Sequence, residues 1–394
     1  MQRSILISGA GIAGPALAYW LAQRGERVVV VEKSKSLRSG GQAVDFRGPV
    51  HRAVLEKMEI WDAICERQTH LGVQALIDSD GRPSAQLPAL MMSGDVEILR
   101  GDLSMLLFER TRAKVDYRFG DSITSLVDEG SGVRVCFEHA PEETFDLVVG
   151  ADGLHSRVRQ LAFGEQSRFL RHHGYRIAGF TMPNVLGLCR TGLIYSEPRR
   201  GVSVTSARDA AEARALFVFR GEPLGKDDRD LSAERAAVHV AFAGAGWETG
   251  RILAEMDRAT DVYFDAVASV HVPTYARGRV VLVGDAASGG TLGGQGTPCA
   301  ILGAYVLAGE LAKSPFDHAA AFARYEATIR PYASRCQKGA SHVGPFIAPR
   351  SRVELHVRNI FYRTLASAPL ERLFEWLVTD AASELALPDY ALAL

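Results

Sequence analysis

Apolar residues recur along this chain with two different spacings, and the first change of spacing lies near the N-terminus. A short apolar run, Ile5 to Ser8, is followed by three glycines and then by the helical spacing of Ala16 to Arg24. A second apolar run, Arg27 to Val31, ends in Glu32. Continuous apolar runs of this length are typical of strands buried in a parallel sheet. The pattern therefore predicts that a strand, a helix and a second strand open the fold.

Buried-strand runs return at Phe145 to Gly150 and at Arg279 to Val283. Between them, from about Phe163 to Pro273, strand-like runs surround one helical segment, Ser232 to Met256, and the parallel rhythm stops. We interpret this stretch as an inserted second domain built on a largely antiparallel sheet. A hairpin predicted for residues 72–85 joins the same domain.

The rest of the chain has helical spacing. We predict helices from Cys299 to Leu311, from Asp317 to Ala340 and, after a break at Pro345 to Pro349, from Val353 to Val378.

Composition and charge limit the kind of protein. The 394 residues are enough for two domains that share an interface, and 47% hydrophobic with 23% charged residues is usual for a globular protein. The formal net charge of −1 argues against a nucleic-acid partner. No run of about 18 apolar residues occurs, so we expect no membrane span. The five cysteines are odd in number and scattered, which argues against disulfides or zinc and favours a reducing, cytoplasmic location.

The first candidate site is the glycine-rich turn after the first strand. Its spacing is G-x-G-x-x-G, in which the first glycine permits a tight turn, the second a close approach of a pyrophosphate, and the third close packing of helix on strand. An acidic residue about 20 positions further on normally binds the adenosine ribose. The residues of this predicted dinucleotide site are Gly9, Gly11, Ile12, Ala13, Gly14 and Glu32.

Two later strand ends point to the same ligand. Asp152 and Gly153 follow one buried strand, and Gly284 and Asp285 follow another, before a loop of high glycine density. NAD is satisfied by a contiguous nucleotide domain, whereas the ribityl chain of FAD would need a further carboxylate such as Asp285. The helix that starts near Pro298 would point its positive end at the flavin. The spacing therefore favours FAD.

We thus predict an α/β fold with an α+β insert: a Rossmann-like FAD-binding domain with a parallel sheet, a substrate domain with a largely antiparallel sheet, and C-terminal helices. The FAD-binding domain would comprise residues 1–70, 92–164 and 275–345. The substrate domain would comprise residues 71–91 and 165–274, and residues 346–394 would form the C-terminal helical segment.

With these motifs in their order, the sequence resembles the class A FAD-dependent aromatic hydroxylases, the flavoprotein monooxygenases that include para-hydroxybenzoate hydroxylase and the tetracycline-inactivating monooxygenases. The resemblance covers the first 165 residues and roughly residues 275 to 340. It implies that Arg100 lies near the FAD pyrophosphate and ribityl chain. It also associates Asp152 and Gly153 with both FAD and the pyridine nucleotide. The cofactor-binding residues expected in addition to the first glycine site are Lys33, Arg100, Asp152, Gly153, Gly284, Asp285, Gly296 and Thr297.

The sequence departs from the family pattern after Asp285. Ser288 stands where the family usually has a histidine, and a glycine-rich turn replaces the proline-rich one. Pro298 replaces an asparagine, and Gly303 occupies the position of an acidic residue. These changes leave backbone contacts to FAD possible, but they alter the flavin environment.

The resemblance implies a single-component enzyme in which NADPH or NADH reduces FAD and molecular oxygen then forms a C4a-hydroperoxide. That species would hydroxylate an aromatic or polycyclic small molecule. No catalytic acid, base or nucleophile stands out, and we expect a monomer or homodimer without nucleic-acid, membrane or metal partners.

Three other functions fit parts of the sequence. A nicotinamide-only dehydrogenase would leave Asp285 unexplained, and a flavin halogenase would need a W-x-W-x-I-P motif that is missing. A non-hydroxylating FAD-binding oxidoreductase or catalytically altered homologue stays open. The loop Lys33 to Gln42 fits either a nucleotide-binding loop or a connector. Candidates for the substrate pocket are Phe180, Tyr195, Phe217, Phe219 and Arg220, although for each aromatic residue taken singly we favour a place in the core on a sheet face.

Overall fold

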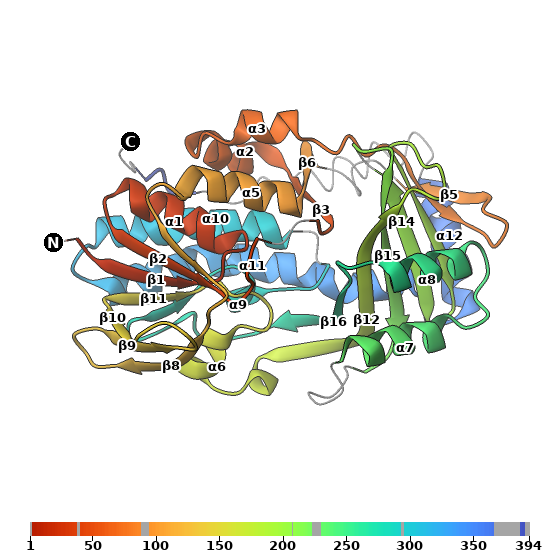
Figure 1. The fold of residues 1–394 in the computed structure, drawn as a ribbon. Helices are drawn as coiled ribbons and strands as arrows, with labels where there is room; N and C mark the ends of the chain where they lie inside the picture. Colours follow the sequence, from red (N-terminus) through yellow and green to blue (C-terminus); the bar gives the residue numbers. More distant parts are fainter. Residues whose placement is uncertain are drawn as a thin grey trace.

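Two sheets stand apart in the molecule, one on the left and one on the right of Figure 1. A long helix, α11 (His318–Ile347), runs across both. The fold is described from a computed structural model, which covers residues 2–37, 40–87, 94–206, 208–222, 230–292, 295–365 and 387–390.

The left-hand sheet has six strands in the order β17-β18-β11-β1-β2-β7. All neighbouring pairs are parallel except β17 with β18. The four apolar runs predicted as buried strands form its centre, β18-β11-β1-β2, which confirms the predicted parallel core. The strands are β1 (Ser4–Ser8), β2 (Arg27–Glu32), β7 (Asp116–Phe119), β11 (Leu147–Gly150), β17 (Ala276–Arg277) and β18 (Val280–Leu282).

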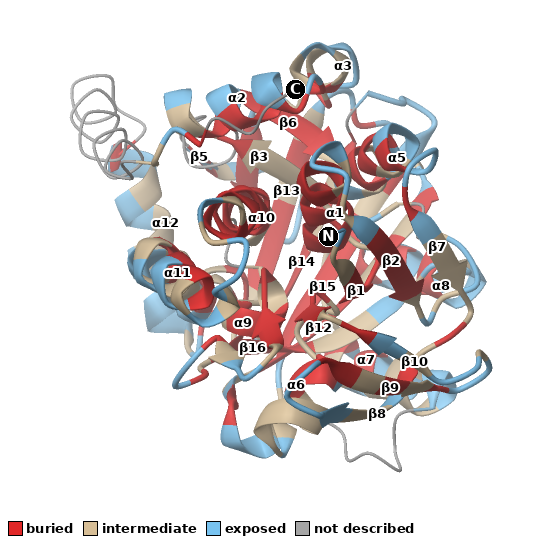
Figure 2. Cartoon of the chain, turned by 90° about the vertical axis from the view of Figure 1, so that its left-hand side faces the viewer, coloured by how far each residue is buried: buried red, intermediate tan, exposed pale blue. Residues whose placement is uncertain are grey.

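Helices cover this sheet on both sides. On one side α1 (Ala13–Gln23) packs against β1, β2, α5 (Arg100–Thr111) and α10 (Gly296–Lys313). Figure 2 shows that α1, α10 and the central strands of this sheet are largely buried. On the other side lies a small antiparallel sheet with α6 (Arg157–Phe163). Its strands are β8 (Ile123–Asp128), β9 (Val133–Phe137) and β10 (Glu143–Phe145).

The right-hand sheet has seven strands in the order β16-β12-β15-β14-β13-β4-β5, antiparallel except for β13 with β4. The hairpin from residues 72–85 therefore joins this sheet, as its pattern predicted. The strands are β4 (Gln74–Ile77), β5 (Pro83–Leu87), β12 (Leu170–Pro183), β13 (Thr191–Glu197), β14 (Arg200–Ser206), β15 (Glu212–Arg220) and β16 (Tyr263–Val270).

Each face of this sheet has its own cover. On the face turned to the viewer in Figure 1 lie α7 (Leu231–Phe242) and α8 (Thr249–Arg258). On the other face lie α11 and α12 (Arg352–Leu365). The contact with α11 is close, since a Cβ added at Gly201 would lie 2.1 Å from the carbonyl oxygen of Ile347. One helix therefore supports both sheets.

The remaining elements lie above the gap between the two sheets in Figure 1 or connect other elements. They are β3 (Ala43–Phe46), which pairs with β6 (Val96–Leu99), together with α2 (Gly48–Lys57), α3 (Trp61–Glu66), the 3-10 turn Gln166–Arg168 and α9 (Asp285–Ser288).

Three predicted elements have different bounds. The apolar run Phe145 to Gly150 is split between β10 and β11, because Asp146 turns its carboxylate to the backbone N–H of Ser4 (2.7 Å). The segment Ser232 to Met256 is two helices, interrupted by glycines 244 and 246. The break expected at Pro345 lies later, since α11 continues to Ile347. A proline near the end of a helix removes few backbone hydrogen bonds.

The aromatic residues suggested as pocket lining lie in the core instead. Phe180, Tyr195, Phe217 and Phe219 are buried on the face that α7 and α8 cover. The rings of Phe217 and Phe242 are 4.6 Å apart. Side chains alternate between faces along a strand, so the opposite face holds their neighbours.

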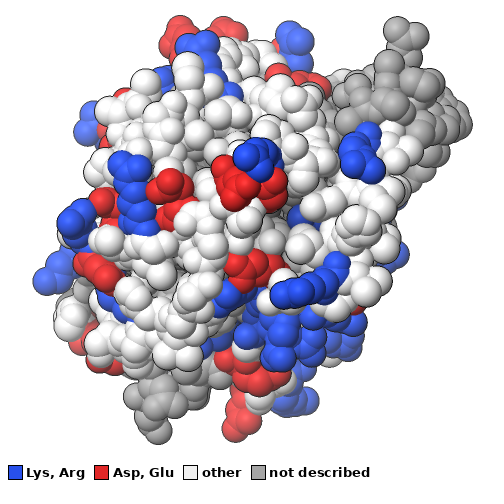
Figure 3. Space-filling view, turned by 90° about the vertical axis from the view of Figure 1, so that its right-hand side faces the viewer, with Lys and Arg blue, Asp and Glu red and all other residues white. Residues whose placement is uncertain are grey.

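Charge is distributed over the surface without one dominant sign. The face in Figure 3 carries acidic and basic side chains among wide uncharged areas, with basic ones gathered toward the lower right. Among the helices of the described residues, none is long and apolar enough to cross a membrane.

Replacing Phe217 with alanine tests the core under α7 and α8. The side chain is fully buried, and removing such a ring typically costs about 3–5 kcal/mol of folding free energy. We expect urea denaturation to show a loss of that size. The matched control is Phe316→Ala, because Phe316 is 97% exposed and its loss should leave the free energy of unfolding unchanged. Equal effects of the two variants would contradict this assignment.

Candidate cofactor and substrate site

The glycine turn after β1 has the geometry that its spacing predicts. Gly9 has φ +107°, and a Cβ at Gly14 would lie 1.9 Å from the carbonyl oxygen of Gly9. A Cβ at Gly11, in contrast, would meet nothing within 4 Å. No side chain caps the first turn of α1 at Ile12 and Ala13. Uncapped N–H groups beside open space are suited to a phosphate.

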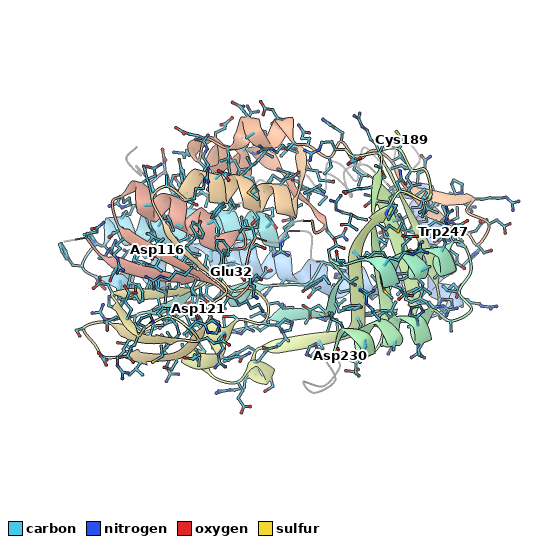
Figure 4. All side chains as sticks on the ribbon, in the orientation of Figure 1. Glu32, Asp116, Asp121, Cys189, Asp230 and Trp247 are labelled. Carbon is cyan, nitrogen blue, oxygen red and sulfur yellow. The ribbon has the colours of Figure 1, made fainter. Side chains whose placement is uncertain are left out.

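Glu32 lies at the end of β2, directly beside this turn. Its carboxylate accepts hydrogen bonds from the backbone N–H of Ala10 (2.9 Å) and of Ser34 (2.9 Å). Figure 4 shows Glu32 at the edge of the parallel sheet that faces the second sheet. The position fits an adenosine ribose, while Lys33, which follows, is exposed.

The strand register brings the other predicted residues to the same edge. Ser8 pairs with both Val31 and Gly150, and Gly150 pairs with Leu282. The residues after these strands therefore lie side by side. A Cβ at Gly284 would lie 2.9 Å from the Cβ of Ala13, so the turn after β18 packs against α1. The predicted convergence of distant segments is present.

Asp152 has a structural position within this cluster. Its carboxylate accepts hydrogen bonds from Ser156 Oγ, Arg157 N (2.7 Å) and Val158 N (3.0 Å), which together cap α6. Burial raises the pKa of Asp152 even though these hydrogen bonds act in the opposite direction. Gly153 follows with φ +80° and open space where a Cβ would be. Asp152 thus holds the loop in place, and Gly153 presents backbone to the site.

Arg159 links this loop to the turn after β18. It is fully buried and donates hydrogen bonds to the carbonyl oxygens of Leu154 (2.6 Å) and Ala286 (3.0 Å). One side chain therefore sets the spacing between the second and third predicted segments.

Asp285 is the unusual group of the cluster. The structure records no hydrogen bond to its carboxylate from any described residue, and burial raises its pKa, with the charge of Arg100 acting in the opposite direction. A buried carboxylate without hydrogen-bond partners is costly. Hydroxyl groups of a ligand would supply the missing donors. The site therefore fits the ribityl chain of FAD.

The start of α10 closes this side of the site. A Cβ at Gly296 would lie 3.3 Å from Asp285 Oδ1, so only glycine leaves the carboxylate accessible. No side chain caps α10 at Gln295, and Thr297 follows Gly296 in its first turn. The positive end of α10 thus points toward the same space as Asp285.

The departures from the family pattern have structural explanations. The glycine-rich turn pairs with β16, since Thr291 N donates to Ala268 O (2.9 Å) and Val270 N to Gly289 O (2.8 Å). A Cβ at Gly303 would lie 3.4 Å from Val283 Cγ2 and 3.7 Å from the hydroxyl oxygen of Tyr325, so this position is closely surrounded by other residues.

Two groups of functional interest were missed from the sequence. Tyr263 donates a hydrogen bond to Asp265, and His155 Nε2 lies 2.9 Å from Asp265 Oδ1. Burial raises the pKa of Tyr263, as does the charge of Asp265, while that of Arg100 lowers it. The tyrosine is therefore close to Arg100. His155 and Asp265 are 110 positions apart, so no local pattern signals their contact.

The second is Arg214 on β15, opposite Thr181. Its Nε is buried and has no hydrogen-bond partner among the described residues. Burial lowers the pKa of Arg214, against the effect of nearby carboxylates that include Asp102 and Asp261. Side chains alternate along a strand, so Arg214, three positions before Phe217, lies on the opposite face of the sheet. We call this face, which α7 and α8 do not cover, the inner face.

His172 and His173 are neighbours on β12. His173 Nε2 lies 3.1 Å from Ser269 Oγ. No group of three His, Cys, Asp or Glu side chains able to hold a metal occurs within the described ranges.

Comparison with known proteins agrees with this geometry. Residues 2–339 match the model of the FAD binding domain family. A flavin-dependent monooxygenase of Legionella longbeachae is 39% identical over 339 residues, covering 85% of this chain and 87% of the relative. An uncharacterized protein of Mycobacterium tuberculosis is 42% identical over 343 residues, covering 85% of this chain and 92% of the relative. The crystal structure of tetracycline destructase Tet(55) superposes with TM-score 0.83 at 35% identity and covers 99% of both chains.

The chain therefore belongs to the FAD binding domain family, and its fold is that of the class A flavoprotein monooxygenases. Within this family it is a FAD-dependent monooxygenase.

Asp285→Asn tests the role of the unpartnered carboxylate in FAD binding. Hydrogen bonds to a charged group contribute about 1.5–3 kcal/mol, so we expect the FAD dissociation constant to rise about 10- to 100-fold. Flavin fluorescence titration of the FAD-free protein measures it. Asp80→Asn, in an exposed turn, is the control and should bind FAD as the wild type does. Unchanged affinity in Asp285→Asn would exclude the proposed contact.

Asp285→Asn should weaken FAD binding, but it should stabilise the FAD-free protein near neutral pH. Because burial raises the folded pKa of Asp285 above its unfolded value, the folded state holds the extra proton in the interval between them. The carboxyl's contribution to stability therefore falls as pH rises through that interval. We expect Asp285→Asn to gain stability over the wild type as pH rises from acidic to neutral. Urea denaturation at several pH values measures this difference, which a pH-independent result would contradict.

Proposed function

We propose that this monooxygenase hydroxylates an aromatic or polycyclic small molecule, with NADPH or NADH as electron donor. The observation that carries the proposal is the half-buried carboxylate of Asp285, which accepts no hydrogen bond from the described residues. It lies beside Arg100 and at the same sheet edge as the glycine turn. This arrangement calls for a long ligand with hydroxyl groups in its middle, as FAD has.

The chain's own residues would bind and orient FAD along this edge. The turn from Gly9 to Gly14 and the start of α1 would hold the pyrophosphate, and Glu32 the ribose. Asp285 and Arg100 would hold the ribityl chain and its phosphates. When bound there, FAD would supply the redox chemistry that couples NAD(P)H oxidation to the transfer of one oxygen atom from molecular oxygen to the substrate.

The substrate would lie on the inner face of the seven-stranded sheet. The loop before β3 reaches this face, since Gln42 Nε2 lies 3.5 Å from a Cβ placed on Gly179. The same loop touches Arg100 at Gly41. Arg214 lies on this face with an unused N–H. A guanidinium with an unused N–H suits a substrate with enolate, phenolate or carbonyl oxygens. The tetracycline destructase among the relatives supports a polycyclic substrate.

Tyr263 would contribute to substrate selection. Its O–H is donated to Asp265, so its oxygen offers only an acceptor to the site. His155 holds Asp265 from the other side and lies 2.8 Å from Gln166 Nε2 through Nδ1. The charged network fixes the tyrosine and favours substrates that donate a hydroxyl proton.

The parallel sheet and the antiparallel sheet would have different ligands. We propose that residues 1–70, 92–164 and 275–345 bind FAD and that residues 71–91 and 165–274 bind the substrate. All five cysteines are free thiols, which fits a reducing cytoplasm.

The decisive experiment measures coupled turnover. Purified protein loaded with FAD should oxidise NADPH or NADH faster when a suitable phenol or polyketide is added, with matching oxygen uptake. Mass spectrometry should then find a product heavier by one oxygen atom. Faster NAD(P)H oxidation without oxygen incorporation across the panel would favour a non-hydroxylating FAD oxidoreductase. A FAD-loaded protein that no compound stimulates would overturn the proposal.

Arg214→Gln tests the substrate face. Loss of one charge-assisted hydrogen bond of about 1.5–3 kcal/mol should raise KM about 10- to 100-fold, with FAD content unchanged. The matched control is Arg82→Gln, because Arg82 lies in the exposed turn between β4 and β5 of the same sheet. If both variants keep the wild-type KM, Arg214 does not contact the substrate.

A further inference from the structure

Two of the five cysteines lie together beside the cofactor site. Cys299 is in the first turns of α10 and is buried, whereas Cys336 is in α11 and half-buried. The two thiols influence each other's pKa, and Cys336 Sγ donates a hydrogen bond to Gln295 Oε1 (3.8 Å). Both line a pocket of about 10 Å³ whose wall also contains Asp285 and Gly296. The thiol pair therefore borders the carboxylate assigned to the ribityl chain.

The surroundings give the two thiols different properties. The interaction with Cys299 lowers the pKa of Cys336, burial opposes this, and Tyr332 and Arg335 lower it further. For Cys299, the interaction with Cys336 raises the pKa, and so do burial and the charge of Asp285. Cys336 is thus the better nucleophile, and Cys299 stays a thiol beside it.

The remaining cysteines lack such a partner. Cys136 donates a hydrogen bond to Glu142, and Cys189 is exposed at the far end of the second sheet (Figure 4). Among the described residues only Cys299 and Cys336 are in thiol–thiol contact. Neither Cys299 nor Cys336 is among the residues predicted to bind FAD.

We propose that Cys299 and Cys336 form a reversible disulfide when hydrogen peroxide reaches this pocket. The thiolate of Cys336 attacks one peroxide oxygen, the O–O bond breaks, and the leaving hydroxide takes a proton to become water. The resulting sulfenic acid is attacked by the sulfur of Cys299, which loses its proton as a second water leaves. Two thiols are oxidised and one peroxide is reduced to two waters.

Hydrogen peroxide has a local source in this class of enzyme. When reduced flavin passes its electrons to oxygen without oxygenating a substrate, the product is hydrogen peroxide. The thiol pair shares a pocket with Asp285, the residue proposed to hold FAD. The disulfide would tie the N-terminal turns of α10 to α11, next to Asp285 and Gly296. Because α10 closes the site, this link would weaken FAD binding and slow a poorly coupled enzyme.

The test treats the FAD-loaded enzyme with hydrogen peroxide, without substrate or NAD(P)H. The protein is then denatured, alkylated and digested for mass spectrometry. We expect a cross-linked peptide containing Cys299 and Cys336, its loss after dithiothreitol, and several-fold faster FAD release from the oxidised protein, followed by flavin fluorescence. The outcome does not depend on hydroxylation, so it stands or fails separately from the proposed function.

Variants separate the two thiols. In Cys299→Ser the sulfenic acid of Cys336 should persist and react with dimedone, whereas in Cys336→Ser no cross-link should form and Cys299 should remain alkylatable. Cys189→Ser is the matched control and should keep the cross-link. Peroxide that oxidises Cys189 while both pocket thiols of the wild type stay alkylatable would overturn the proposal. A disulfide that leaves FAD release unchanged would overturn its regulatory part.

Discussion

The arrangement of the site depends on one electrostatic constraint, the partial burial of the Asp285 carboxylate without a hydrogen-bond donor among the described residues. Proteins usually avoid this, because the desolvation of a carboxylate is not recovered unless hydrogen bonds replace water. Here the neighbouring residues that the structure describes leave the carboxylate without a hydrogen-bond donor. Gly296 leaves the carboxylate uncovered, and Arg100 offers charge without a recorded hydrogen bond. The free protein is therefore prepared for a ligand that brings hydroxyl groups.

The cofactor half of the site could be predicted from the sequence because its geometry is local or topological. The spacing of Gly9, Gly11 and Gly14 requires a turn and close packing that only glycine permits. The carboxyl ends of neighbouring parallel strands lie at one edge, so residues after β1, β11 and β18 had to meet. The role of Asp152 was less visible, since its donors come from the helix that follows it.

The substrate half could not be predicted in the same way. Alternation along a strand separates two faces but does not say which face the helices cover, so Phe180 and Phe217 were suggested for the pocket although they belong to the core. Tyr263, Asp265 and His155 meet only through the folding of distant segments. Cys299 and Cys336 meet because α10 and α11 pack together, which scattered cysteines do not reveal.

The helix α11 has a consequence for how such enzymes diversify. It packs on α10 beside the cofactor edge and continues under the seven-stranded sheet, where Gly201 touches its last turn. The cofactor half and the substrate half thus both pack on α11. We therefore do not expect the strands that would meet the substrate to be exchangeable between homologues without this helix. A chimera that transplants the antiparallel layer must carry the matching stretch of α11 with it. New specificities in this lineage should therefore arise by point changes on the inner face more readily than by recombination.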